Sequence, residues 1–532
     1  MLRKPPKTSA SPERMVISMG IHIESVLPKY ESYLRDESRL TGHAEKIAFP
    51  ESPADMAAAF QYAREENLCV TLQGGRTGIV GGASPRGGLI VCTEKMNRIL
   101  GLRKEEGRFF LRVQAGVTLQ QLEAYGRYPE TPAEAAEAER AAVAALKRAG
   151  RHFFGPNPTE KSATLGGLFA CDAGGINSLR YGRTARQVRA LTWVTPSGEI
   201  WEVRRVQYLF DENGCSLPNG TRFSCRTDLP AAPHSLRLPR EGMDLIDFLV
   251  ASEGYYGAAA EMEVCLTPQP AEGWGVLYFF QKEEQVFRFS ENLRDWRDTD
   301  SVGYLCGAEY YDSAVLNLVR ERKQQITAFK ALPDFPPNAL AAVYVELCGG
   351  DPARLEEALY TQLELFAEAG GEEADTWAAG SFAELERYRE LRHAVPEALN
   401  TEIDRLRQAF PELVKTTADY KAPPELAADY LRRYHGDIAG TGLRGFVFGH
   451  ILENHFHVNL LPESEEQLGN GRALLKTWAE QVVRDGGILA AENGVGKLKA
   501  DLIRAYIPEP IMAFLQDARK IFDPYHLMDS QL

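Results

Sequence analysis

The chain of 532 residues has few cysteines, and none of the eight belongs to a CxxC pair. Zinc ribbons and iron–sulfur clusters usually need such pairs, so neither kind of site is expected. In a chain of this length, scattered cysteines are typical of reduced thiols in the cytosol, mostly buried. We therefore expect Cys215 and Cys225 to stay unpaired, although they flank a loop rich in turn-forming residues.

Positive charge and long apolar runs are also scarce. The chain has 60 basic and 74 acidic residues, and its net charge of −14 argues against a nucleic-acid binder, which needs clustered positive charge. No stretch approaches the roughly 18 apolar residues of a membrane-spanning helix. The basic first residues lack the apolar segment of a signal peptide. We predict a cytoplasmic protein, and peripheral docking at a membrane stays open.

Glycine, by contrast, is concentrated in two stretches that lie far apart. The first is GGRTGIVGGA (74–83), and the second comprises ATLGG (163–167) and AGG (173–175). Glycine lets a ligand approach the backbone amides closely, and runs of such amides form concave anion sites. The two stretches predict one large anionic cofactor held by several loops. The pattern differs from the strand–GxGxxG–helix order of nicotinamide-binding units, and no GK[ST] of a P-loop follows.

The pattern of apolar residues and turn signals divides the chain into four parts. Residues 1–45 read as a polar, partly helical lead-in. Residues 46–270 show an α/β pattern, in which we expect a helical insertion at 127–150 and a loop excursion at 205–240. Residues 271–480 alternate strands with amphipathic helices, and 481–532 form a C-terminal segment. Near the start of the second part, Ser52 and Pro53 predict the beginning of a helix, as N-cap and first helical residue.

Three of the ten histidines fall within residues 450–457. The residues around them predict two strands joined by a turn at 452–454. Alternation along the second strand places His455, His457 and Asn459 on one face, and His450 can approach His457 across the hairpin. Two imidazoles and a carboxylate form a common site for a divalent metal, with Glu492 as the leading third ligand. The alternative is a hydrogen-bonded histidine cluster without metal.

Six segments in this order resemble the FAD-binding oxidoreductases of the vanillyl-alcohol-oxidase fold. The branch with the best match comprises D-lactate, glycolate-oxidase D-subunit and D-2-hydroxyglutarate dehydrogenases. The segments are GGRTGIVGGASPRGG (74–88), PNPTEKSATLGGLFACDAGGINSLRYGRT (156–184), SEGYYGAAAE (252–261), GHILENHFHVNLLP (449–462), ENGVGKLK (492–499) and FDPYHLMD (522–529). The resemblance implies an α+β fold: a two-subdomain, PCMH-type FAD-binding domain (46–270), a substrate or cap domain (271–480), and a C-terminal segment (481–532) that returns to the FAD domain.

The resemblance also implies non-covalent FAD, because the first loop carries no histidine that could bond to the flavin. The pyrophosphate is expected on the first loop and the flavin beside the second, with further backbone contacts from the segment around residues 252–257. The expected cofactor-binding residues are Gly74, Gly75, Arg76, Thr77, Gly78, Gly81, Gly82, Pro156, Thr164, Gly166, Gly167, Ala173, Gly174, Gly175, Glu253, Gly257, Glu492 and Asn493.

In the metal-dependent members of this branch, the residues equivalent to His450, His457 and Glu492 hold a divalent ion, which we expect to be Zn or Mn. Such an ion would bind the substrate's carboxylate and acidify its hydroxyl, while hydride passes from the substrate to flavin N5. Arg392 resembles the family's arginine for the substrate carboxylate, and Lys415 is a further candidate. A solvated charge on a helix is the alternative for Arg392.

The chain departs from the family pattern at two positions. Asn493 stands where the family has its presumed general base, a histidine, and a carboxamide cannot accept a proton at neutral pH. His455 stands where the family usually has asparagine. The exchange suggests that His455 acts as the base, because imidazole has a suitable pKa. The alternative is a site that has changed its substrate or lost activity.

The resulting expectation is an FAD-dependent dehydrogenase of a small 2-hydroxy acid, such as D-lactate, glycolate or D-2-hydroxyglutarate. Its electrons would pass to a separate acceptor: an electron-transfer flavoprotein, a quinone or a partner subunit. Two alternatives stay open: an oxidase or dehydrogenase of another alcohol on the same fold, and a non-catalytic FAD-binding subunit of a complex. A homo-oligomer is compatible with the sequence.

Overall fold

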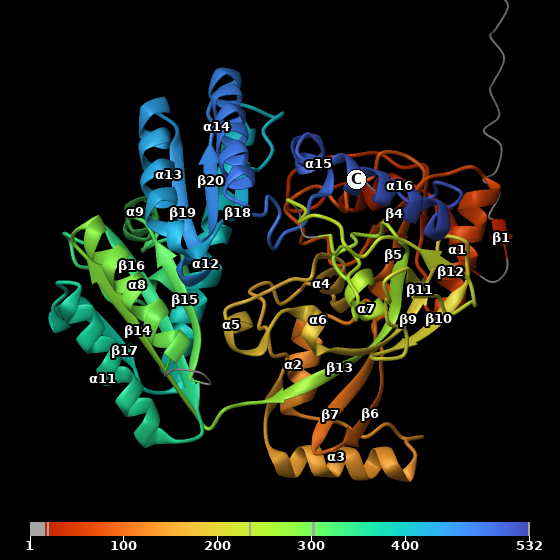
Figure 1. Cartoon of the computed structure of the whole chain (residues 1–532), viewed down its shortest axis with the longest axis horizontal. Helices are drawn as coiled ribbons and strands as arrows, with labels where there is room; N and C mark the ends of the chain where they lie inside the picture. Colours follow the sequence, from red (N-terminus) through yellow and green to blue (C-terminus); the bar gives the residue numbers. More distant parts are fainter. Residues whose placement is uncertain (1–15, 19–20, 234–235, 300–303, 530–532) are drawn as a thin grey trace, which may run out of the picture.

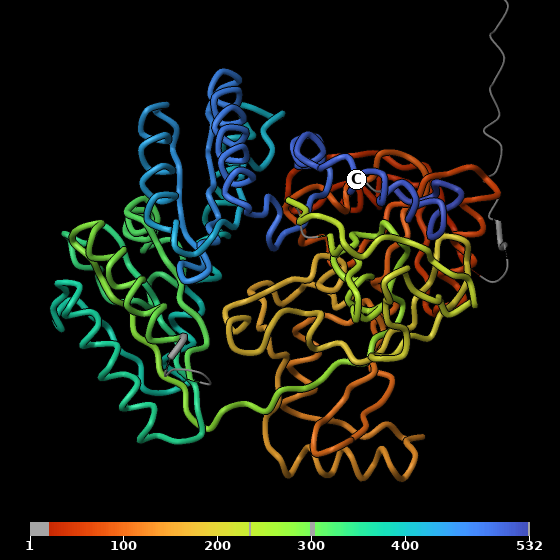
Figure 2. The backbone as a smooth tube through the Cα atoms, in the orientation of Figure 1, coloured from red at the N-terminus to blue at the C-terminus, as the bar shows by residue number. Residues whose placement is uncertain are grey.

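The computed structural model describes residues 16–18, 21–233, 236–299 and 304–529, and it has two lobes (Figure 1). The chain builds the first lobe up to strand β13 (Ala258–Pro268) and enters the second with strand β14 (Glu272–Phe280). It returns to the first lobe near its C-terminus, so the backbone crosses between the lobes twice (Figure 2). Pro268 and Pro270 lie at the first crossing, next to the predicted boundary after residue 270.

The first subdomain of this lobe is a five-stranded sheet in the order β1-β2-β3-β5-β4, whose last three strands run parallel. Helix α1 (Pro53–Glu65) connects β3 to β4, and the Ser52 hydroxyl accepts the N–H of Asp55 at its start, which confirms the predicted cap. The strands are β1 (Val16–Ser18), β2 (Ile21–Ser25), β3 (Lys46–Ala48), β4 (Val70–Gln73) and β5 (Leu89–Cys92).

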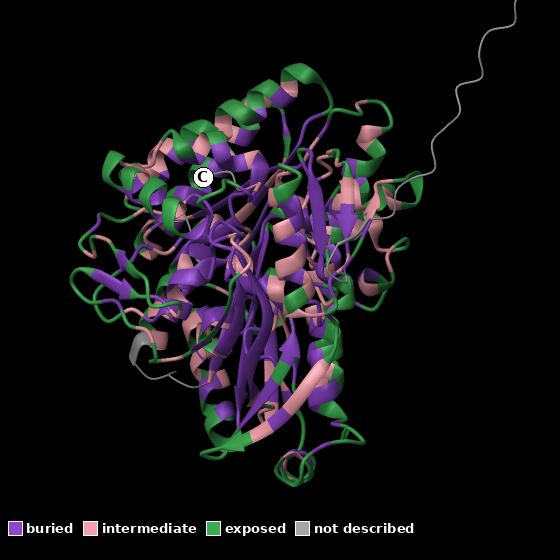
Figure 3. Ribbon diagram, turned by 90° about the vertical axis from the view of Figure 1, so that its right-hand side faces the viewer, coloured by how far each residue is buried: buried purple, intermediate pink, exposed green. Residues whose placement is uncertain are grey.

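The second subdomain is a six-stranded antiparallel sheet in the order β10-β9-β13-β7-β6, with β8 paired to the far end of β13. Its strands are β6 (Ile99–Glu105), β7 (Arg108–Gln114), β8 (His152–Phe153), β9 (Val188–Val194), β10 (Ile200–Arg204) and β13. Its helices are α2 (Leu119–Arg127), α3 (Glu137–Ala149), α4 (Leu165–Cys171), α5 (Ser178–Tyr181), α6 (Thr184–Gln187) and α7 (Leu245–Leu249). The buried strands run through the centre of the molecule, while exposed residues gather on outer helices and loops (Figure 3).

The second lobe is a seven-stranded antiparallel sheet in the order β17-β14-β16-β15-β19-β20-β18, covered by helices. Besides β14, its strands are β15 (Leu305–Tyr311), β16 (Ala341–Gly349), β17 (Thr376–Ala379), β18 (Thr416–Lys421), β19 (Arg444–His450) and β20 (His455–Leu461). The helices are α8 (Glu283–Thr299), α9 (Ser313–Arg322), α10 (Thr327–Lys330), α11 (Pro352–Glu368), α12 (Phe382–Arg407), α13 (Ala427–Thr441) and α14 (Glu465–Arg484).

The C-terminal segment joins the two lobes. Helix α15 (Gly496–Arg504) buries Ile503 in the core of the second lobe, whereas helix α16 (Glu509–Phe522) buries Phe514 and Phe522 in the core of the first. Beyond α16, the chain forms a parallel bridge from Met528 to Val70 at the edge of the first sheet. The segment therefore returns to the first lobe, as the sequence predicts.

Three expectations for the first lobe need correction. The lead-in is partly helical as expected, with a 3-10 helix at Pro28–Leu34, but it also contributes β2, whose Ile21 and Ile23 are buried in the core. Its residues 1–15 and 19–20 lie outside the described part. The expected insertion at 127–150 is helical only from residue 137, because two prolines interrupt residues 128–136. The excursion at 205–240 also differs, since it forms a small sheet of β11 (Gly214–Ser216) and β12 (Arg222–Ser224) and packs Phe223 into the core. The sequence does not reveal this contribution to the core, because the apolar residues of the segment alternate with turn residues.

Two predicted absences can be compared with the structure. All eight cysteines are free, including Cys215 and Cys225. Within the described ranges, no helix combines the length and apolar character needed to cross a membrane.

Candidate functional site

A cavity of about 570 Å³ opens between the two subdomains of the first lobe, and the second lobe closes one side of it. Its walls come from both glycine-rich loops, from residues 251–259, from α12 and β18 to β20, and from residues 492–497. This volume lies within the roughly 300–1,000 Å³ that is usual for ligand and cofactor sites. The cavity therefore joins segments that are far apart in the sequence.

The two glycine-rich loops touch each other along one wall of this cavity. A Cβ atom on Gly75 would lie 2.6 Å from the carbonyl oxygen of Ser162, and one on Gly74 would overlap the Thr164 hydroxyl. In the described part of the chain, no acceptor receives the backbone N–H groups of residues 75–78. Successive unpaired amides form an anion site, which fits a pyrophosphate group.

Most of the predicted cofactor residues line the cavity. The exceptions are Gly81, Pro156 and Gly175, which lie outside its lining. Glu253 lines the cavity but has a structural partner, because its carboxylate accepts the N–H groups of Val495 at 2.7 Å and Gly496 at 2.9 Å. Burial raises the pKa of Glu253 despite these two hydrogen bonds. Glu253 therefore holds the beginning of α15 against the cofactor cavity.

The histidine hairpin forms as predicted, with a 3-10 turn at Ile451–Glu453 between β19 and β20. The register places His450 opposite His455, and His457 opposite Phe448. The ring centres lie 5.9 Å apart for His450 and His457, 5.4 Å for His450 and His455, and 4.8 Å for His455 and His457. All three imidazoles belong to one cluster.

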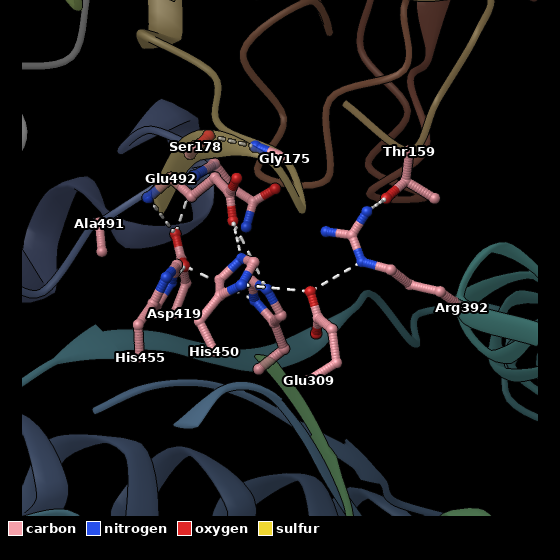
Figure 4. Close-up of polar contacts among 12 residues, drawn as sticks. Thr159, Gly175, Ser178, Glu309, Arg392, Asp419, His450, His455, Ala491 and Glu492 are labelled. Atoms are coloured by element: carbon pink, nitrogen blue, oxygen red, sulfur yellow. Dashed lines mark hydrogen bonds and ion pairs between the residues drawn. The ribbon is translucent and has the colours of Figure 1, made fainter. Parts of the chain in front are cut away.

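Two of these histidines meet the predicted third ligand. Nε2 of His450 lies 3.5 Å from a carboxylate oxygen of Glu492 (Figure 4). Nε2 of His457 lies 3.6 Å from the same oxygen. Two ligand atoms each about 2.1 Å from a tetrahedral metal lie about 3.4 Å apart, so each of these two pairs has the spacing of metal ligands. Around them, the possible ligand atoms of His450, His455 and Glu492, and those of Asp419, His455 and His457, lie within 4.8 Å of one another. Glu492 and His457 line the cavity, whereas His450 lies just behind its wall.

A carboxylate also lies near the second ring nitrogen, Nδ1, of each of these two histidines. Nδ1 of His450 lies 3.2 Å from Glu309, and Nδ1 of His457 lies 3.7 Å from Asp419. This is the usual arrangement for metal-ligating histidines, whose second nitrogen meets a carboxylate. Burial opposes protonation of His450, but Glu309 and Glu492 outweigh it and raise its pKa to about 10. Burial and the neighbouring His455 lower the pKa of His457 to about 4.

Asp419 connects the hairpin to the C-terminal segment, and the sequence analysis missed it. It is fully buried on β18 opposite His457, where it accepts the backbone N–H groups of Glu492 at 3.2 Å and Asn493 at 2.9 Å. Lys499 Nζ lies 3.3 Å from the same carboxylate. Lys499 and the histidines outweigh burial and hold the pKa of Asp419 well below its usual range. Its contact with the histidines could not be seen in the sequence, because it depends on the pairing of β18 with β20, which places Asp419 opposite His457.

The placement of His455 differs from the expectation that it faces the substrate. Its side chain is buried and lies outside the lining of the cavity. Its Nε2 atom is 2.6 Å from Asp419 Oδ1. The alternation along β20 is as predicted, but His457 and Asn459 reach the cavity and His455 does not, because the Asp419 carboxylate holds it. Asn493 does line the cavity.

Arg392 and Lys415 both reach the cavity wall. Arg392 is largely buried on α12, where its Nε donates to Glu309 at 2.8 Å and its Nη1 donates to Thr159 at 2.6 Å. It is therefore not the solvated helix charge that was the alternative. Lys415 is also buried, and burial together with the nearby Arg39 lowers its pKa to about 8. Glu309 was not found from the sequence either.

Two protein families match successive parts of the chain. The model described as "FAD binding domain" matches residues 44–128 and 132–204, and the model described as "FAD linked oxidases, C-terminal domain" matches residues 293–530. Together they include parts of both lobes and the returning C-terminal segment, and neither matches residues 205–292. They confirm the resemblance and the order of the two domains.

Whole-chain relatives are distant. A D-lactate dehydrogenase of Anaerostipes hadrus is 24% identical over 511 residues, which are 94% of this chain and 92% of that protein. A D-lactate dehydrogenase of Archaeoglobus fulgidus is 23% identical over 91% of this chain and 90% of its own length. A D-2-hydroxyglutarate dehydrogenase of Escherichia coli (strain K12) is 26% identical over 91% of this chain, which spans about half (47%) of that protein.

A solved structure of alkyldihydroxyacetonephosphate synthase superposes with a TM-score of 0.59. It is 14% identical, and the match covers 96% of this chain and 82% of that one. At this identity the likeness confirms the α+β fold and carries no statement about the reaction.

Proposed function

Because the chain belongs to the FAD-linked oxidases, we propose that it is an FAD-dependent dehydrogenase of a 2-hydroxy acid. The observation that carries this proposal is that His450 and His457 both approach Glu492 beside a cavity that is also lined by the unpaired backbone amides of residues 75–78. The named activities of the distant relatives, D-lactate and D-2-hydroxyglutarate dehydrogenases, support the same class of substrate.

The residues of the cavity divide between two tasks. The amides of residues 75–78 would hold the pyrophosphate of FAD, which when bound supplies the acceptor for a hydride. His450, His457 and Glu492 would hold a divalent ion, which supplies a Lewis acid beside the substrate's hydroxyl. Two imidazoles and a carboxylate suit Zn or Mn, and His450, whose pKa is raised to about 10, would release its proton when the ion binds.

Two cations would bind the acid group of the substrate. Glu309 and Thr159 fix the Arg392 guanidinium in one orientation at the cavity wall, and its remaining N–H groups can pair with a carboxylate. Lys415 adds a second cation from another element of the second lobe. Such a preset arrangement aligns an acid substrate before reaction.

His455 takes a positioning role in this proposal, in place of the base role suggested by the sequence. Its hydrogen bond to Asp419 stabilises the carboxylate that also binds the backbone of Glu492 and Asn493. Through Asp419 it would set the position of the metal-binding carboxylate, which is how the partners of metal ligands act.

The test is anaerobic bleaching of the visible absorbance of bound flavin by a panel of D- and L-2-hydroxy acids. We expect bleaching by at least one acid, and loss of it after chelation and restoration by Zn or Mn. A flavin that stays oxidised with every acid would overturn the proposal and indicate a non-catalytic subunit.

A second measurement addresses the electron acceptor. Under air, a dehydrogenase produces little hydrogen peroxide and passes electrons to an added electron-transfer flavoprotein or quinone. Stoichiometric peroxide formation would identify an oxidase instead.

A further inference from the structure

Two cysteines and a glutamate meet in the sheet of the second lobe, in a group separate from the histidine centre. Cys306 belongs to β15, and Glu346 and Cys348 belong to the neighbouring strand β16. Their possible ligand atoms, two sulfurs and one carboxylate oxygen, all lie within 4.8 Å of one another. The group needs no CxxC pair, because the pairing of the two strands brings the three side chains together.

The backbone explains why these side chains share one face of the sheet. Alternation along β16 puts Glu346 and Cys348 on the same side. On β15 the register with β16 shifts between residues 305 and 307, so Cys306 is the extra residue of a β-bulge. A bulge re-aims a side chain, and this one brings the Cys306 sulfur to the side of Glu346 and Cys348.

The spacing of the group is that of zinc ligands. The Cys348 thiol donates to Glu346 Oε1 with 3.6 Å between sulfur and oxygen. A tetrahedral zinc with sulfur at about 2.3 Å and oxygen at about 2.0 Å holds these two ligands about 3.5 Å apart. Arg389 donates to both oxygens of Glu346, and the Tyr344 hydroxyl donates to Oε2 at 2.9 Å. An ion can therefore take the place of the thiol proton beside a carboxylate that is already held.

The surrounding charges favour a divalent ion bound by thiolates. Glu346 pairs with Arg389, and Nη1 of Arg180, from the first lobe, lies 3.7 Å from Cys306 Sγ. With both thiols protonated, the carboxylate and the two arginines sum to a net charge of +1. A zinc ion that replaces the two thiol protons leaves this sum unchanged, so binding adds no net charge to a buried region, where such charge is costly.

The group is buried but has a path for entry. Cys306 and Glu346 have no exposed surface, whereas Cys348 is 3% exposed and lines a cleft of about 260 Å³ between the lobes. A hydrogen bond with Cys306 and burial raise the pKa of the Cys348 thiol well above its ordinary value, so a thiolate forms there only with a cation beside it. An ion can enter through the cleft, and a water from the cleft can complete a tetrahedral set of ligands.

We propose that Cys306, Glu346 and Cys348 form a second metal site, for zinc, distinct from the histidine centre. Two thiolates and one carboxylate bind the ion, and the two thiol protons leave as it enters. The ion would join β15 to β16 where Arg180 of the first lobe also donates to the backbone oxygen of Cys348. Its role is therefore structural, and it does not depend on the proposed reaction.

The experiment adds cobalt(II) to the FAD-loaded protein after chelation of bound metals, with the thiols kept reduced by a phosphine. Thiolate ligands give cobalt(II) a strong charge-transfer band in the near ultraviolet, which imidazole and carboxylate ligands do not give. The difference spectrum therefore separates this site from the histidine centre. We expect the band in the wild type, and its loss when zinc is added, because such sites bind zinc more tightly than cobalt.

Four variants sharpen the test. Cys306→Ser and Cys348→Ser should each remove the band and weaken zinc binding at least about a hundredfold, since loss of a group that only supports a ligand already costs about 10- to 100-fold. Cys265→Ser is the matched control, because Cys265 is buried and lies 3.1 Å from Arg108 Nη2, yet belongs to no group of three possible ligands within the described ranges. Glu492→Gln should keep the band, since it alters only the histidine centre. Retained FAD shows in each case that the variant is folded.

The outcomes separate this inference from the proposed function, which flavin bleaching tests. Absence of the band from the reduced wild type overturns the inference and leaves the proposed function standing. A band that persists in both Cys306→Ser and Cys348→Ser, or that disappears in Glu492→Gln, overturns it as well. If peroxide links the two cysteines in a protein that shows no band, they form a redox pair instead of a metal site.

Discussion

A single methyl group added at Gly75 should push the two glycine-rich loops of the cofactor cavity apart. It should therefore weaken FAD binding or the fold more than a change of charge at the rim of the cavity does. In Gly75→Ala, the new Cβ would lie 2.6 Å from the carbonyl oxygen of Ser162, and real Cβ atoms do not approach oxygen so closely. The obstacle is backbone, so no rotation of a side chain relieves the clash. One of the two glycine-rich loops must therefore move away from the other.

The magnitude follows from overpacking, which typically costs about 1–3 kcal/mol. If the loop relaxes in the free protein, bound FAD must push it back, and the cost appears in the FAD dissociation constant as about 5- to 160-fold. If the loop cannot relax, the same cost appears in the free energy of unfolding. The expected cost of about 1–3 kcal/mol therefore applies to the sum of two losses: the loss in the free energy of FAD binding and the loss in the free energy of unfolding.

The measurement combines FAD titration of the apoprotein, followed by quenching of flavin fluorescence, with urea unfolding of the apoprotein. Gly350→Ala is a matched control, because Gly350 lies outside the cavity and has nothing within 4 Å of its Cβ position. Neither glycine has a positive φ, so the control should be neutral or stabilised by about 0.4–1 kcal/mol. Equal behaviour of the two variants would refute the idea that the loops' contact shapes the FAD site.

Three further predictions concern the histidine centre and its surroundings. Glu492→Gln should lower the content of bound divalent metal at least about tenfold, by elemental analysis, while bound FAD is retained; loss of FAD instead would place Glu492 in the cofactor site alone. His455→Asn should lower turnover, because a positioning residue is lost, and should leave the pH dependence of kcat/KM unchanged. If the fall of kcat/KM at low pH disappears instead, His455 is the base after all. Lys415 has a pKa lowered to about 8 from 10.5, so its charged form destabilises the fold by up to about 3 kcal/mol below pH 8, and this cost fades as the pH rises towards 10.5. Lys415→Met should therefore unfold at a higher urea concentration than the wild type at pH 7, and the difference should be smaller at pH 10. A difference in urea midpoint that grows with pH would contradict a buried charge on Lys415.

The elements that the sequence predicts well are those specified by local chemistry. Ser52 and Pro53 mark the start of α1 because an N-cap and a first-turn proline act within one turn of helix. The histidine hairpin was also predictable, since alternation along β20 is a local pattern. The glycine-rich loops could be predicted to line a cavity, because closely spaced glycines let a ligand approach the backbone.

The partners of the site could not be predicted, because they depend on the order of strands in a sheet. Glu309 reaches His450 only because β15 lies beside β19, and Asp419 reaches His457 only because β18 lies beside β20. In the sequence, each is the one acid on its strand. The error over His455 has the same origin, since Asp419 supplies the hydrogen bond that holds it away from the cavity.

The short segment from Glu492 to Gly496 links the two halves of the proposed reaction. Asp419, from the second lobe, binds its first two backbone N–H groups, and Glu253, from the first lobe, binds its last two. A cofactor that orders the loop containing Glu253 must therefore also bias the position of the Glu492 carboxylate. Since Glu492 faces both His450 and His457, FAD and metal should each bind more tightly in the presence of the other, and by linkage the two enhancements must be equal.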